Sequence, residues 1–229
     1  MDLKNNRRLM LEPGFTEETY SFLLNLAFNN NKTWFEAHKE EYVRFLQKKL
    51  VALEEMLAPE ILKIDPNVRT GRYAIARIYR DTRFSANKSP FRDHLWIAYR
   101  PCGVRMSEYF TMYFEVTPIT YGYGCGWYGA SVADMNTFRS KVLANPSRFE
   151  KLICDNNLMK TFTLGGEDYK RPKVTDASRL LLPWLNKKGL YLHHETNELK
   201  GSMSKALADE VIDAFHTLAP IYRYIHEFD

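Results

Sequence analysis

The stretch YGYGCGWYGAS, residues 121–131, constrains the fold more than any other part of this chain. Glycine alternates with tyrosine, cysteine or tryptophan from residue 121 to residue 127. Because successive side chains of a strand point to opposite faces, this period of two predicts a strand with one bare glycine face and one bulky face. A bare face admits a helix, a neighbouring backbone or a ligand at close range.

The same stretch contains Gly124-x-Gly126-x-x-Gly129, the letter pattern of a dinucleotide-binding loop. Such a loop turns sharply after a strand, opens a helix and leads to a second parallel strand that carries an acid about 20 residues later. Here two helix patterns follow instead, VADMNTFRSKVLA behind a Ser131 cap and PSRFEKLICDN behind Asn145. We therefore favour the glycine-faced strand over the nucleotide loop, and we expect no cofactor.

The segments before this strand predict two helices and then three strands. EETYSFLLNLAF follows the N-cap candidate Thr16, and Phe15 is placed to pack on Tyr20. From Asn31 onward, apolar residues three and four apart predict a second helix that ends before Pro59. Segments rich in aromatic and β-branched residues then predict strands over 73–80, 95–100 and 109–117.

The last third of the chain mixes short elements. We expect a loop over TLGGEDYKRPK, a helical turn near residues 180–187, and a strand in LYLHHET. A helical tail follows, with Ser202 or Ser204 as its cap, and Pro220 is placed to begin a final helix. Helices that flank a central block of about five strands predict an α+β fold with a mainly antiparallel sheet, in a single domain over residues 1–229.

Composition limits the class of protein but not its activity. The 229 residues are 45% hydrophobic, which fits a globular chain, and no apolar run is long enough for a signal peptide or a membrane span. Three scattered cysteines provide neither a disulfide framework nor a zinc pair. We expect a soluble cytoplasmic protein without a metal or membrane association. Its oligomeric state is left open.

Positive charge is concentrated in one short part of the chain. Residues 69–105 hold nine arginines or lysines against two aspartates, so this segment carries +7 whereas the whole chain carries +4. Within it, RDTRFSANKSPFR, residues 80–92, is a polar connection longer than a simple hairpin needs. Its guanidinium, ammonium and hydroxyl groups suit a phosphate or carboxylate ligand, and its carboxylate can orient an arginine. The candidate ligand-binding residues of this connection are Arg80, Asp81, Arg83, Ser85 and Lys88. The alternative is a salt-bridged turn without a ligand.

RDTRFSANKSPFR resembles the signature of the conserved hypothetical proteins grouped as domain of unknown function 2461. FLLNLAFNNNKTWFEAHKEEY, GWYGASVADMNTFR and YKRPK agree with the same family, so the resemblance covers residues 15 to about 175. It implies a fold and a functional surface but no activity. The family pattern maps onto Arg80, Asp81, Arg83, Phe84, Ser85, Lys88, Pro90, Trp34, Phe35, Trp127, Arg139, Lys170 and Arg171. This chain departs from it at Asn87, where the family has an acid, and at Phe91, where tyrosine is common.

Three functions remain open at this point. In the first, the 80–92 segment, Arg139 and the pair Lys170 and Arg171 converge on a pocket beside Trp127 that binds a small anionic ligand, with or without catalysis. In the second, the +7 segment and its interleaved aromatic residues bind nucleic acid. In the third, the basic segment is structural and the protein is a non-catalytic interaction partner. No catalytic residue is singled out, and His193 and His194 point to opposite strand faces, which disfavours a metal site.

Overall fold

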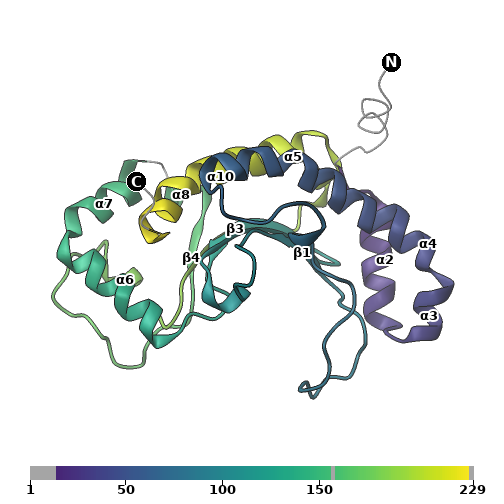
Figure 1. The fold of residues 1–229 in the computed structure, drawn as a ribbon, viewed down its shortest axis with the longest axis horizontal. Coiled ribbons are helices and arrows are strands. Elements are labelled where there is room, and N and C mark those ends of the chain that lie inside the picture. Colours follow the sequence, from purple (N-terminus) through teal and green to yellow (C-terminus); the bar gives the residue numbers. More distant parts are fainter. Residues whose placement is uncertain (1–13, 156–157, 227–229) are drawn as a thin grey trace. The chain divides into compact units, whose positions relative to one another are not determined.

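A computed structural model of the chain describes residues 14–155 and 158–226. In these ranges five strands form one sheet in the order β1-β2-β3-β5-β4, with helices before, between and after them (Figure 1). The strands are β1 (Leu95–Ala98), β2 (Thr111–Val116), β3 (Tyr121–Gly126), β4 (Thr163–Gly165) and β5 (Tyr191–Thr196). The predicted α+β fold with a central antiparallel sheet is confirmed.

The chain divides into two compact units. The first comprises residues up to 99, residues 114–122 and residues 195–212; the second comprises residues 100–113, 123–194 and 213 onward. Strands β2, β3 and β5 and the last helix contribute residues to both units. The expectation of a single domain stays a prediction.

The first two helices of the first unit begin where their capping residues predict. The helical elements of residues 17–73 are α2 (Glu17–Phe28), α3 (Lys32–Ala37), α4 (Lys39–Glu41), the π-helical segment η1 (Tyr42–Gln47), α5 (Lys48–Ile64) and the short 3₁₀ segment η2 (Gly71–Tyr73). Thr16 is the N-cap of α2, and the Asn31 side chain accepts a hydrogen bond from the Trp34 N–H at the start of α3. Beneath them Phe15 stacks on Phe114, with ring centroids 5.7 Å apart.

The predicted helix over 31–58 is wrong in two respects. It is interrupted at His38, which ends α3, and α5 continues through Pro59 to Ile64. Proline removes one hydrogen bond of a helix, at a cost of roughly 3 kcal/mol. The last turns nevertheless bury Leu57, Ile61 and Ile64 almost completely, and burial of each such side chain is worth about 1.5–3 kcal/mol. Tertiary packing therefore outweighs the helix-breaking residue.

The second unit contains α6 (Val132–Ala144), α7 (Pro146–Asp155), α8 (Leu158–Thr161) and α9 (Leu182–Leu185). Ser131 and Asp134 cap α6 reciprocally, as predicted: the Asp134 N–H donates to Ser131 Oγ at 3.1 Å and the Ser131 N–H donates to Asp134 Oδ2 at 2.9 Å. The predicted helix start at Pro220 is wrong, because α10 (Ala206–His226) runs through it without a break. Its flanking residues Ile221 and Tyr222 are fully buried, which again outweighs the proline.

Two of the predicted strand assignments also need correction. Residues 73–80 form no strand: their backbone bridges to the chain that follows at the isolated positions Ile75 to Ile97 and Tyr79 to Phe91. The fifth strand is instead β4, which lies inside the segment predicted as a loop and pairs antiparallel with β5. With three residues, β4 is too short to give an alternation pattern.

Strand β3 confirms the glycine-faced prediction and identifies what approaches the bare face. A Cβ atom on Gly124 would lie 2.0 Å from the Leu192 carbonyl oxygen, and one on Gly126 would lie 2.2 Å from Tyr191 Cβ. The backbone of β5 therefore occupies the space that side chains would need. Tyr123 and Cys125 on the other face are buried. Because the strand continues through Gly126, the pattern is not a dinucleotide loop.

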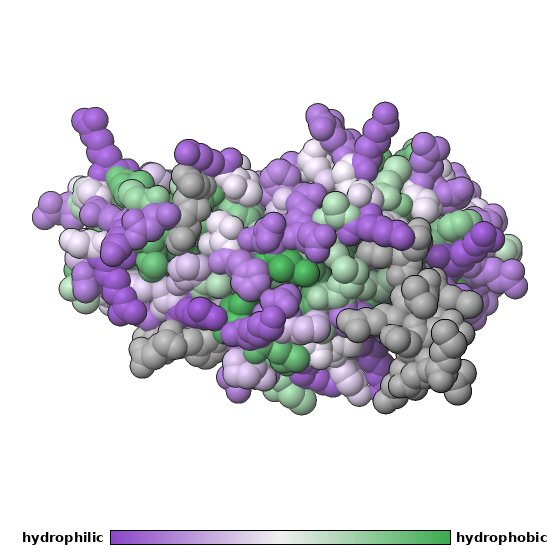
Figure 2. Space-filling view, turned by 90° about the horizontal axis from the view of Figure 1, so that it is seen from above, coloured by the Kyte–Doolittle hydropathy of each residue, from purple (hydrophilic) through white to green (hydrophobic). Residues whose placement is uncertain are grey.

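Most of the surface seen in Figure 2 is hydrophilic, and apolar residues appear there as smaller areas between the charged ones. Exposed large apolar side chains of the described residues include Phe28, Phe84, Ile119 and Tyr128. Individual exposed apolar residues are normal on folded proteins. Only one of these four, Phe84, lies in the basic segment that the sequence analysis singled out.

Candidate functional site

The 80–92 segment is the outer part of a hairpin in the first unit. Its two arms are joined by the Arg80 N–H, which donates to the Pro90 carbonyl at 2.9 Å, and by the Arg92 N–H, which donates to the Ile78 carbonyl at 2.8 Å. We call residues 78–92 the 78–92 hairpin. In Figure 1 it extends away from β1 as a long projection drawn in blue-green.

A bulge lies at the base of this hairpin. Three residues separate the bridged positions Ile75 and Tyr79, whereas five residues separate their partners Phe91 and Ile97. The second arm therefore carries two residues more than the first. Such bulges redirect side chains and are frequent beside functional sites. The bulged segment, residues 92–96, includes Asp93 and His94.

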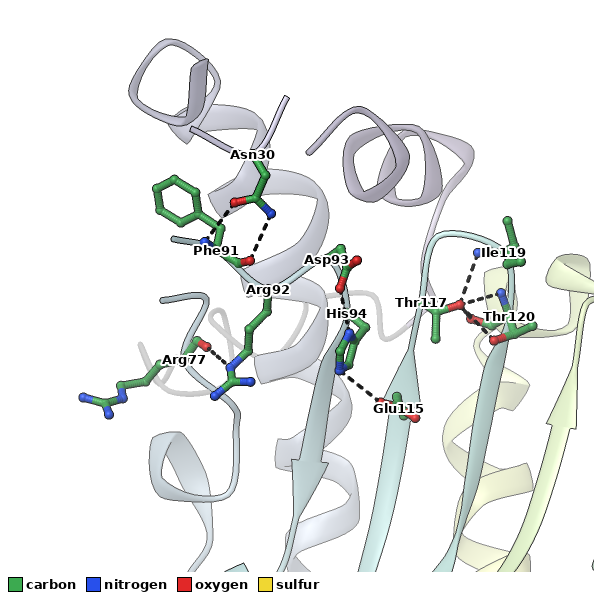
Figure 3. A network of polar contacts seen from close by, with 10 residues as sticks. All are labelled: Asn30, Arg77, Phe91, Arg92, Asp93, His94, Glu115, Thr117, Ile119 and Thr120. Atoms are coloured by element: carbon green, nitrogen blue, oxygen red, sulfur yellow. Dashed lines mark hydrogen bonds and ion pairs between the residues drawn. The ribbon is translucent and has the colours of Figure 1, made fainter. Parts of the chain in front are cut away.

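Helices of the first unit hold the base of the hairpin from the other side. The Asn30 side chain accepts from the Phe91 N–H and donates to the Phe91 carbonyl, both at 3.0 Å (Figure 3). The ring of Phe91 stacks on Phe35 of α3, with centroids 4.1 Å apart, and both rings are buried. A two-point amide clamp and a buried ring pair therefore fix where the hairpin leaves the unit.

The predicted ligand-binding residues of the hairpin interact with one another. Arg83 forms a bidentate ion pair with Asp81, with contacts of 3.0 and 2.7 Å, and this arginine holds the pKa of Asp81 at about 2. Lys88 Nζ donates to the Thr82 carbonyl at 2.9 Å, and Arg80 Nη2 lies 3.5 Å from Ser85 Oγ. The ion pair is exposed to solvent, so its charges remain accessible to a ligand that competes for them.

Arginine side chains also lie against aromatic rings in this unit. The guanidinium carbon is 5.8 Å from the ring centroid in the pair Arg83 and Phe84, and 4.6 Å in the pair Arg92 and Trp96. Arg69 lies 3.6 Å from the centroid of Tyr73. Phe84 is 96% exposed, and Tyr73 is 52% exposed. The pairs of Arg83 with Phe84 and of Arg69 with Tyr73 therefore place a positive charge beside an exposed ring.

The bulge brings His94 between two carboxylates (Figure 3). His94 Nδ1 lies 2.8 Å from Asp93 Oδ1, and Nε2 lies 3.8 Å from Glu115 Oε1 on β2. Burial raises the pKa of Glu115; His94 opposes this rise and the Glu195 carboxylate adds to it. Asp93 and His94 are adjacent in the chain, but Glu115 lies in a separate strand, so no local sequence pattern indicates this group.

Trp127 lies in the second unit and lines a cavity of about 210 Å³ there. Other aromatic walls of the cavity are Tyr109, Phe110 and Phe138. Its polar walls are Glu108, Asp134, Thr137, Lys141 and His226. None of the other predicted site residues lines it. The residues that form it come from the segment before β2, from the position after β3, from α6 and from the end of α10.

Arg139 is buried in the second unit, where internal acceptors bind its guanidinium. Nε donates to the Leu185 carbonyl at 2.7 Å, Nη1 donates to Asn136 Oδ1 at 3.0 Å, and Nη2 donates to the Lys187 carbonyl at 2.6 Å. The bonds to Leu185 and Lys187 tie α6 to the end of α9 and to the segment that follows it. The geometry supports a structural role for this arginine.

Lys170 and Arg171 are exposed in the connection between β4 and α9. Their neighbour Tyr169 lies with its ring centroid 5.3 Å from the Arg139 guanidinium carbon, so the structure brings this segment close to Arg139. Arg80, Asp81, Arg83, Ser85 and Lys88 lie in the first unit, and Trp127, Arg139, Lys170 and Arg171 lie in the second. Their convergence on one pocket stays a prediction.

The two adjacent histidines of β5 have separate surroundings. His194 stacks on Tyr123 with centroids 4.9 Å apart, whereas His193 lies 5.2 Å from Tyr191. In residues 14–155 and 158–226, no group of three or more histidine, cysteine, aspartate or glutamate side chains is placed to hold a metal ion. No helix in the same ranges is long and apolar enough to cross a bilayer.

Comparison with known proteins identifies a family but no individual relative. The family described as "Conserved hypothetical protein (DUF2461)" matches residues 18–224, which extends the resemblance seen in the sequence to nearly the whole chain. A search of curated proteins found no match. The match covers more than half of the chain and includes the 78–92 hairpin and the glycine-faced strand, so the chain belongs to the DUF2461 family of conserved hypothetical proteins.

Proposed function

We propose that the first unit binds phosphate-bearing ligands through the 78–92 hairpin, and that single-stranded nucleic acid is the ligand its geometry favours. The observation that carries this proposal is the pairing of exposed arginine with exposed aromatic rings, above all Arg83 beside the 96% exposed Phe84. Cations neutralise backbone phosphates, and rings stack on bases whatever their sequence.

The alternative, a small anionic ligand, uses the same cations without the rings. It requires donors that surround one phosphate or carboxylate. Arg83, Lys88 and Arg80 already bind Asp81, the Thr82 carbonyl and Ser85, and they lie along an exposed hairpin. An extended ligand reaches such a row of cations more readily than a single small anion does. This geometry favours the polyanion.

The test measures binding of fluorescently labelled oligothymidylate and oligoadenylate by anisotropy over a range of salt concentrations. We expect binding at low salt that weakens as salt rises, because each neutralised phosphate releases counterions. Arg83→Ala should reduce the slope of log K against log salt by about 0.7 for a single-stranded ligand. Asp81→Asn should tighten binding, because it removes a negative charge that competes with phosphate for Arg83.

Phe84→Ala separates stacking from charge. It should weaken oligonucleotide binding by about 1–3 kcal/mol, which is fivefold to more than a hundredfold. Tyr128→Ala is the matched control, because Tyr128 is an 86% exposed aromatic residue of the second unit. Absence of binding at low salt, or equal effects of the two variants, contradicts the proposal. Displacement of the oligonucleotide by AMP at comparable concentration assigns the hairpin to a small ligand instead.

A further inference from the structure

The cavity of the second unit has its own chemistry, which the hairpin does not explain. On α6, Asp134, Phe138 and Lys141 lie at helical spacings of four and three and so share the face that lines the cavity. Trp127 lies opposite, directly after β3. The cavity volume of about 210 Å³ is smaller than the roughly 300–1,000 Å³ that drug-sized ligands occupy, so it has room only for a small molecule.

The aromatic wall of the cavity is already assembled. Phe110 meets Trp127 edge to face, with centroids 4.8 Å apart and planes at 72°, and Phe138 meets Trp127 at the same angle at 6.5 Å. These contacts hold the indole from two sides. A fixed aromatic wall binds flat, apolar groups and attracts cations to ring faces.

The charged groups around the cavity are held in place by the backbone. Asp134 accepts from the Ser131 N–H at 2.9 Å, and Glu108 accepts from the Arg105 N–H at 3.3 Å. Lys141 Nζ donates to the Tyr224 carbonyl and lies over the Tyr224 ring, which draws the ammonium toward that side. Arg105 Nε lies 3.8 Å from Glu108 Oε1, whereas no lysine or arginine of the described residues pairs with Asp134. The side of the cavity at Asp134 therefore carries the negative charge.

His226 contributes an N–H donor to the cavity wall, and its hydrogen-bond partner identifies the ring nitrogen that carries the proton. Nε2 lies 2.8 Å from the Phe110 carbonyl oxygen, and because a carbonyl oxygen only accepts, Nε2 carries a proton. The ring stacks on Tyr109 at 4.1 Å. The histidine therefore closes the cavity as one more flat wall, anchored to the chain beside Phe110.

We propose that this cavity binds a small aromatic amine, with the ring system against Trp127 and the ammonium group at Asp134 and Glu108. The aromatic walls supply the contact area, and the carboxylates select the positive charge. This assignment differs from the anion that the sequence predicted beside Trp127, because the charges of the lining favour a cation.

Ligand-observed NMR and calorimetry with the full chain test the proposal with matched probes. We expect tryptamine and phenethylamine to bind in the millimolar range or tighter, and indole-3-propionate, which carries a carboxylate in place of the amine, to bind at least tenfold more weakly. Equal binding of tryptamine and indole-3-propionate overturns the charge selection. Absence of saturation transfer to tryptamine at millimolar concentration overturns the site.

Variants locate the site without disturbing the fold. Asp134→Asn keeps an oxygen for the Ser131 N–H but removes the charge, and it should weaken tryptamine binding at least fivefold; Asp176→Asn, on the exposed connection, should leave it unchanged. Thr137→Phe fills the cavity from an exposed position of α6 and should abolish binding, whereas Ser140→Phe on the same helix should not. Identical affinities within either pair overturn the proposal.

Discussion

Gly124→Ala tests whether the glycines of β3 exist to admit a neighbouring backbone. The new Cβ atom would lie 2.0 Å from the Leu192 carbonyl oxygen, whereas real Cβ atoms essentially never come within 3.0 Å of such an atom. The two strands would therefore have to separate by about 1 Å. N–H···O bonds near 2.9 Å would lengthen beyond the range in which they hold.

The cost of this separation is the sum of two effects. Overpacking in a core costs about 1–3 kcal/mol, and each weakened hydrogen bond costs about 0.5–1.5 kcal/mol. We therefore expect Gly124→Ala to lower the free energy of unfolding by about 2–4 kcal/mol. For a chain of this length that corresponds to a decrease in Tm of about 4–16 °C, measured by calorimetry or circular dichroism.

Gly129→Ala is the control within the same glycine pattern. The closest atom to its new Cβ is Ser107 Cβ at 3.6 Å, an ordinary contact, and its φ is not positive. Because alanine restricts the unfolded chain, this variant should be neutral or more stable by up to about 1 kcal/mol. A dinucleotide loop reverses this order, since its third glycine permits close packing of helix on strand. Equal Tm values for the two variants refute the reasoning.

Three further changes test other contacts. Burial raises the pKa of Glu54, so the folded chain binds the proton of this carboxyl more tightly than the unfolded chain does. In urea titrations, the unfolding free energy of the wild type should therefore fall relative to that of Glu54→Gln as pH rises from about 4.5 to neutrality. Parallel plots of unfolding free energy against pH for the two proteins contradict this. Asn30→Ala removes both hydrogen bonds to Phe91 and should cost about 1–3 kcal/mol in the same assay, so an unchanged midpoint rejects the clamp. Arg139→Met should lower the free energy of unfolding by about 3 kcal/mol or more, because it leaves buried carbonyl groups unpaired. The control Arg171→Met, at an exposed position, should change this free energy by no more than about 0.5 kcal/mol. An Arg139→Met protein as stable as the wild type argues for a binding role of Arg139 instead.

The parts of the fold that follow from short-range interactions were predictable from sequence. Thr16, Asn31 and Ser131 all begin helices as expected. A cap needs only a side-chain oxygen and the N–H groups of the next turn, and all of these lie within four residues. The alternation that predicts β3 is equally local, because each residue needs only its two neighbours to define a face.

The errors occur where distant residues decide the outcome. Pro59 and Pro220 both lie inside helices whose following turns are buried against other parts of the chain. No local rule shows that burial of Ile61 or Tyr222 will compensate for a lost hydrogen bond. Residues 73–80 have strand-like composition, but the two extra residues of their partner segment prevent a continuous ladder.

The same distinction explains how much of the candidate site could be foreseen. The length and the charges of the 78–92 hairpin are visible in the sequence. The bulge at its base depends on register, and the approach of His94 to Glu115 depends on the pairing of β1 with β2. A signal was available in part, since Asp93 and His94 lie next to residues 80–92 in the chain, but nothing local pointed to Glu115.

The hairpin combines a rigid base with an open tip, and this contrast bears on its role. Burying a phenylalanine stabilises a fold by about 1.5–3 kcal/mol, and the chain obtains this at Phe91, which is packed on Phe35. It forgoes the same gain at Phe84, which is 96% exposed next to Arg83. A segment needed only for packing would be buried at its tip as well as at its base. A tip that leaves a ring and a guanidinium in solvent, on a base held by Asn30, has the properties of an element that binds another molecule.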